Sequence, residues 1–188
     1  MDAVILSVFF RREWLYGESE AEASRIIAEV MEGLEGEREG ESGHFPGEDA
    51  WFCLAERRCS DEESVAKSSL RVAANRRTGY GALVWFADKR FPRSGGIYDS
   101  VWVSDNPEPP DFDPSVVSDP GYPLFHDPAS TLPIPVVRTA VEEFCRAGTG
   151  ERPESIGWIA GEMNGQRSDR SPIVDFVEDP VLDWDSLR

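Results

Sequence analysis

The residues best suited to chemistry in this chain are carboxylates, and many of them gather in one proline-rich segment. Residues 105–128 read DNPEPPDFDPSVVSDPGYPLFHDP, with six Asp or Glu, seven Pro and no Lys or Arg. Asp111 and Asp113 could begin a calcium loop, but such a loop also needs a mid-loop Gly and a distal bidentate Glu. The segment supplies neither, so the sequence predicts no metal site and no cofactor here.

Histidine and cysteine offer little more for catalysis. His44 and His126 lie in polar stretches without a recognised Ser or Cys nucleophile nearby, and His126, beside Asp127, is expected to be a hydrogen bonder within a loop. Three cysteines make no disulfide framework. Cys53 and Cys145 are predicted to fill the core, and Cys59 to be exposed and unreactive. The sequence therefore favours a protein that is not an enzyme, with a carboxylate-based metal-dependent hydrolase as the alternative.

The charge of the chain limits its partners. It has 188 residues, 36 Asp or Glu against 19 Lys or Arg, and a formal net charge of −17. Such a charge repels nucleic acid and anionic membranes and attracts basic partners. Three arginine doublets, at 11–12, 57–58 and 76–77, are expected to pair with acidic neighbours rather than to form a basic patch.

The acidic segment itself is predicted to be a protein-binding surface. Its prolines restrict the backbone, which lowers the entropy lost on docking, and its aromatic residues could anchor a partner while the carboxylates steer it. A second interpretation is that the aromatics fold the loop onto the body. A polar segment at 161–166 is a further candidate surface, although a structural turn also explains it. The predicted contact residues are Trp102, Asp105, Glu108, Asp111, Phe112, Asp113, Tyr122 and Phe125.

The elements that must position these residues follow from local patterns. Two segments are predicted helices: residues 19–34, where Ser19 and Glu22 form a capping box, and residues 132–148, with Pro135 in the first turn and Gly148 at the end. Residues 80–87 are apolar on both faces and predict a central strand. Residues 35–49 are polar and Gly-rich and predict a solvated loop. The whole order is β-α-β-β-β-β-α-β, an α+β fold with a mostly antiparallel sheet of about six strands.

One domain over residues 1–167 is expected, followed by an acidic, extended tail at 168–188. The first residues, MDAVILSVFF, lack the positive n-region and the cleavage site of a signal peptide, and no apolar run reaches the ~20 residues of a membrane span. The expected location is the cytosol. The oligomeric state does not follow from the sequence.

A resemblance adds a partner to this interpretation. The motifs RTGYGALVWF, YDSVWVSDNPEPPDFDP and LPIPVVRTAVEEFCRAGTGERPESIGWIAGEMNGQR, within residues 77–167, resemble in order and spacing the immunity proteins encoded beside deaminase-superfamily toxins of bacterial polymorphic toxin systems. The resemblance implies a non-enzymatic inhibitor that holds a cognate toxin inactive. Deaminases act on nucleic acid or nucleotides, so a basic groove is expected on the toxin. A housekeeping interaction protein is the remaining alternative.

Overall fold

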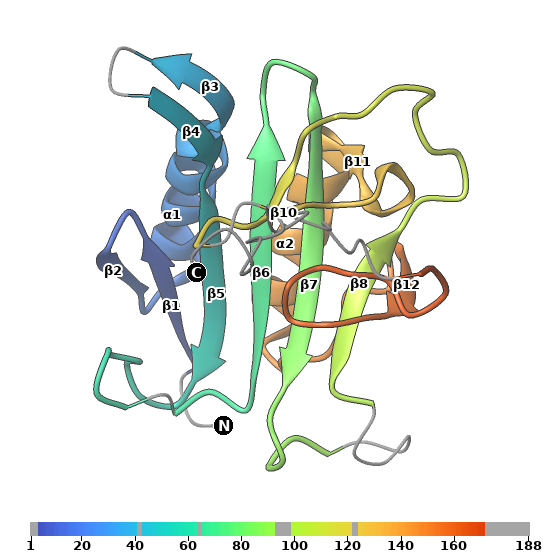
Figure 1. Ribbon diagram of the computed structural model, residues 1–188. Helices are drawn as coiled ribbons and strands as arrows, with labels where there is room; N and C mark the ends of the chain where they lie inside the picture. The colour runs from blue at the N-terminus through green and yellow to red at the C-terminus, as the bar shows by residue number, and fades with distance from the viewer. Residues whose placement is uncertain (1–3, 41–42, 64, 93–98, 122–123, 172–188) are drawn as a thin grey trace, which may run out of the picture.

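A computed structural model describes residues 4–40, 43–63, 65–92, 99–121 and 124–171. These residues form an antiparallel sheet of eight strands, covered on one face by two helices (Figure 1). The predicted α+β class is confirmed. The strands, in their order across the sheet, are β12 (Gly157–Ala160), β8 (Val101–Asp105), β7 (Tyr80–Ala87), β6 (Ser68–Asn75), β5 (Asp49–Ala55), β1 (Ile5–Phe10) and β2 (Glu13–Gly17), with β11 (Leu132–Pro133) paired to β7.

The centre of the sheet is buried on both faces, as the pattern of residues 80–87 predicts. All eight residues of β6 are buried, and β7 is buried along most of its length. Leu70 and Leu83 belong to the main core beneath the helices. On the opposite face, Val116 and Val117 pack against alanines of β6 and β7. The molecule therefore has three layers: helices, sheet, and a covering segment of irregular chain that includes most of the predicted acidic loop.

Helix α1 (Glu20–Gly33) begins at the predicted capping box. The Glu22 backbone N–H donates to Ser19 Oγ at 3.3 Å, and the Ser19 backbone N–H donates to Glu22 Oε2 at 3.1 Å. These hydrogen bonds satisfy two donors that the first turn would otherwise leave without partners. The pKa of the Glu22 carboxyl is lowered, first by a hydrogen bond from the Glu18 backbone N–H and then by one from the Ser19 hydroxyl. Ile26, Ile27 and Val30 form the buried face.

Ser19→Ala should lower the free energy of unfolding by about 1 kcal/mol, because a backbone donor of the first turn loses its acceptor. Urea denaturation at neutral pH measures this change. Ser24→Ala is the matched control, since Ser24 lies inside the same helix and makes no cap. Equal losses for the two variants would contradict the assigned role of Ser19.

Helix α2 (Ile134–Ala147) also follows its sequence closely. Pro135 lies in the first turn, and Gly148 ends the helix with a φ of 67°, in the left-handed region that glycine adopts readily. Four residues one or two turns apart are buried against the sheet: Val137, Ala140, Val141 and Phe144. Among the described residues, no helix is long and apolar enough to span a membrane.

Two short hairpins were not predicted. Residues 5–17 form the β1–β2 hairpin, where only one strand was expected before α1. The expectation of a solvated loop at 35–49 is wrong over most of its length, because β3 (Gly36–Gly40) and β4 (Gly43–Gly47) pair there as a two-stranded ribbon. Arg38 lies over the Phe45 ring at 4.8 Å from its centroid. The ribbon is not paired with the main sheet, but both of its strands contact β6, which provides the support that a two-stranded ribbon needs.

Candidate partner-binding surface

The predicted acidic loop divides into two parts with different environments. Residues 106–113, here named the acidic ridge, follow β8 and lie at the surface, with Phe112 47% exposed. The chain then returns to the sheet through buried Val116, β9 (Val117–Asp119), β10 (Leu124–Phe125) and the short 3-10 helix η2 (Pro128–Ser130). Among the described residues of the loop, the acidic ridge is therefore the more exposed part, while Val116 and Val117 of the later part pack against the sheet.

Both ends of the acidic ridge are held by hydrogen bonds. At its start, the Asn106 backbone N–H donates to the Ala129 carbonyl and Asn106 Nδ2 donates to the Thr131 carbonyl, each at 2.7 Å. At its end, Asn75 Nδ2 and Thr78 Oγ1 both donate to the Pro114 carbonyl at 3.0 Å. These anchors and the prolines fix the backbone before any partner binds, which reduces the ordering cost of association.

The ridge brings together four of the eight predicted contact residues. Glu108, Asp111, Phe112 and Asp113 are all exposed within a few residues of one another. Phe112 meets the ring of Tyr80 edge to face at 5.7 Å between centroids, so the aromatic side chain is positioned without being buried. None of the three carboxylates forms an ion pair with another described residue. The result is an ordered, uncompensated negative surface with one apolar anchor.

The other predicted contact residues are occupied elsewhere or not described. Asp105 forms an ion pair at 2.8 Å with Arg167, which also pairs with Asp169 at 2.9 Å. Trp102 points to the helix side of the sheet, packs against the main core, and lies 3.8 Å beneath the Arg152 guanidinium. Phe125 is half-buried in β10. Tyr122 lies outside the described residues.

The arginine doublets behave largely as predicted. Arg11 pairs with Glu48 at 2.9 Å, Arg57 with Glu63 at 3.1 Å, and Arg58 with Glu18 at 2.7 Å. The pairing with Glu48 raises the pKa of Arg11. The third doublet differs, because Arg76 and Arg77 donate to backbone carbonyls.

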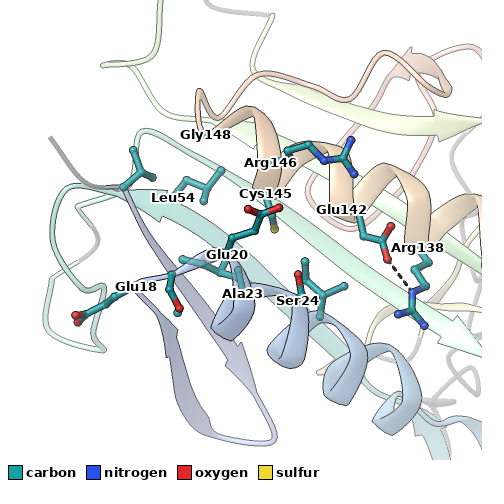
Figure 2. A pocket seen from close by; sticks show the side chains of 15 residues that line it. Glu18, Glu20, Ala23, Ser24, Leu54, Arg138, Glu142, Cys145, Arg146 and Gly148 are labelled. Atoms are coloured by element: carbon teal, nitrogen blue, oxygen red, sulfur yellow. Dashed lines mark hydrogen bonds and ion pairs between the residues drawn. The ribbon is translucent and has the colours of Figure 1, made fainter. Parts of the chain in front are cut away.

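A pocket lies in a groove between α1 and α2, and no residue of the ridge lines it (Figure 2). It has a volume of about 540 Å³, with Glu18 and Glu20 on the α1 side and an Arg138–Glu142 ion pair at 2.9 Å on α2. The single thiol on its wall, Cys145, has its pKa raised to about 12 by burial, which leaves it protonated and unreactive at neutral pH. Its charges are mixed, so the groove does not share the ridge's uniform negative potential.

Two predictions about single residues are wrong. His126 does not lie in a polar loop: it is 4% exposed, and its Nδ1 atom has no hydrogen-bond partner among the described residues. Cys59 is not exposed: it is fully buried in a small cluster with Cys53 and Ala66, against which Trp14 of β2 packs. In both cases the misleading signal was a polar neighbourhood in sequence, since the covering residues come from distant parts of the chain. In the described part of the chain, no three His, Cys, Asp or Glu residues gather as metal ligands.

The fold and this surface define a class: a small acidic α+β protein that presents a preformed, negatively charged ridge. The chain belongs to the Imm1 family of immunity proteins, since the family model described as Immunity protein Imm1 matches residues 18–160. The match includes α1, the central sheet, the acidic ridge, α2 and β12. It supports the predicted class of immunity protein and implies a cognate toxin as the partner. Comparisons with curated proteins and with solved structures found no match.

Proposed function

We propose that this immunity protein neutralises a toxin of the deaminase superfamily by laying the acidic ridge over the toxin's basic substrate-binding face. The observation that carries the proposal is the set of three exposed carboxylates around exposed Phe112, none of which forms an ion pair with a described residue. A toxin that binds nucleic acid needs cationic side chains in its groove. An ordered negative ridge is complementary to that groove in charge, and its bulk would exclude the substrate.

The charge of the whole protein supports the same mechanism. A net charge of −17 attracts a basic partner over distances longer than direct contact, so encounter is fast at low ionic strength. Fast capture matters for an inhibitor made in the same cell as its toxin. The ridge then fixes the orientation of the encounter, and Phe112 supplies apolar area that slows dissociation.

The test is charge reversal on the ridge. The triple variant Glu108→Lys, Asp111→Lys, Asp113→Lys should lower the association rate for the toxin encoded beside it about ten- to a hundred-fold at low salt, because the steering potential is reversed at the contact. Stopped-flow association measures the rate, and survival of cells that co-express both proteins measures protection. The loss should shrink as salt is added.

The matched control is Glu13→Lys, Glu56→Lys, Glu62→Lys. These three carboxylates are also exposed and belong to β2 or to the chain after β5, toward the β2 edge of the sheet, whereas the ridge follows β8 near the other edge. Both triple variants change the net charge equally. A larger loss of association rate in the ridge variant than in the control therefore reports the local contact and not the long-range attraction. Equal losses in the two variants, or full protection by the ridge variant, would place the contact surface elsewhere.

A further inference from the structure

Two of the three cysteines converge on one serine at the β1–β2 side of the sheet. Cys53 in β5 is the direct Cα partner of Ser7 in β1, so both side chains lie on the sheet face opposite the helices. The Cys59 backbone N–H donates to Ser7 Oγ at 3.1 Å. Cys53 and Cys59 are buried in one small cluster with Ala66. The fold therefore brings together two thiols that are separated by five residues in sequence.

The two thiols are not equivalent. The pKa of Cys59 is lowered to about 6, chiefly by the Cys53 thiol and further by the Ala66 and Val65 backbone N–H groups and the Ser7 hydroxyl, against the opposing effect of burial. The pKa of Cys53 is raised well above its usual value, first by its interaction with Cys59 and then by burial. Of the two thiols, Cys59 therefore ionises more readily and Cys53 keeps its proton more firmly.

The loop at residues 56–63 lies over this pair, with Trp14 of β2 packed against the same cluster. Residues 56–58 and 60–63 are exposed, and Cys59 alone among residues 56–63 points inward. The loop is closed by a hydrogen bond from Ser60 N to the Glu63 carbonyl at 3.1 Å and by the exposed Arg57–Glu63 ion pair. It is joined to the rest of the fold by Trp14 Nε1, which donates to Asp61 at 2.8 Å, by Tyr16 OH, which donates to the Cys59 carbonyl at 2.9 Å, and by the exposed Arg58–Glu18 ion pair. Exposed contacts of this kind are weak, so local opening of the loop is expected to be far easier than unfolding of the sheet.

We propose that Cys59, held against Ser7 beside Cys53, is a peroxide-reactive thiol and that Cys53 is its resolving partner. The Cys59 thiolate attacks one oxygen of a hydroperoxide, the O–O bond breaks, and the leaving alkoxide or hydroxide takes a proton to give Cys59 sulfenic acid. The Cys53 sulfur then loses its proton and attacks the sulfenic sulfur. The S–S bond forms and water leaves, so two thiols are oxidised and one peroxide is reduced. This site is independent of the acidic ridge.

The test uses the full-length protein and hydrogen peroxide. After brief treatment with about one equivalent, free thiols are blocked with iodoacetamide and the protein is digested with trypsin without reduction. Trypsin cleaves after Arg57 and Arg58, so Cys53 and Cys59 fall in separate peptides that only a disulfide can join. The expected product is a joined pair about 2 Da lighter than the two peptides, because two hydrogens are lost. Dithiothreitol should separate it, and Cys145 should stay alkylated.

Cys53→Ser should abolish the joined pair and leave a sulfenic acid on Cys59 that dimedone traps. Cys145→Ser is the matched control and should change neither the product nor its rate. Linkage that appears only in denaturant, or peroxide oxidation of Cys59 no faster than that of Cys145, would overturn the proposal. If a serine variant does not fold, the digest of the wild-type protein alone shows whether peroxide links Cys53 to Cys59.

Discussion

Arg71→Met is expected to lower the free energy of unfolding by about 3–5 kcal/mol, because it leaves a partly buried carboxylate without its cation. Arg71 is 8% exposed in the middle of β6. Its Nε donates to Asp49 Oδ2 at 2.5 Å, and Nη1 donates to the Met163 carbonyl at 2.9 Å. The guanidinium therefore ties the chain after β12 to the sheet. Urea or thermal denaturation measures the loss.

Two controls distinguish the loss of the Arg71–Asp49 ion pair from the loss of a positive charge elsewhere on the protein. Arg25→Met removes an arginine from an exposed pair with Glu29 at 3.5 Å and should cost less than about 1 kcal/mol. Asp49→Leu combined with Arg71→Met should cost less than the sum of the two single changes, because neither charge is then left buried alone. Strict additivity would mean that the two side chains do not interact.

The helices and the centre of the sheet could be predicted because their signals are local. The Ser19–Glu22 capping box and the apolar spacing of α2 lie within one or two turns of the residues they organise. The β1–β2 hairpin gave no such signal. Its turn uses Arg11 and Arg12, with φ of 52° and 66°, where glycine or asparagine is usual. The Arg11 side chain contributes by bonding Glu48 and the Gly33 carbonyl, contacts that no local pattern reveals.

The candidate site could be predicted only in part, because some of its contacts are made by residues far away in the sequence. Exposed carboxylates among prolines are visible in the sequence, and four of the predicted contact residues do gather on the acidic ridge. The sequence could not show that Arg167 pairs with Asp105 or that Arg152 covers Trp102, because these partners come from the far end of the chain. Val116 and Val117 mark where the loop turns inward, and two consecutive apolar residues amid acids were the available signal.

Acidification is expected to destabilise the protein through His126 well before most carboxylates are protonated. Burial, and then the positive charge of Arg71, lower the pKa of His126 to about 3, and a hydrogen bond to the Gly165 backbone opposes the shift only partly. An unfolded histidine has a pKa near 6.5. The native ring is thus neutral where the unfolded one is charged. Stability is complete above about pH 6.5 and falls by about 1.4 kcal/mol per unit as the pH drops toward 3.

His126→Gln isolates this effect, because glutamine does not titrate. From pH 7.5 to pH 5.0 the wild type should lose about 2 kcal/mol more than the variant, as measured by urea midpoints. His44 and all carboxylates are present in both proteins, so their titration cancels in the difference. Arg71→Met should weaken the pH dependence, since His126 loses a neighbouring positive charge. Parallel pH profiles for wild type and His126→Gln would show that the ring is already charged, or accessible to water, in the native state.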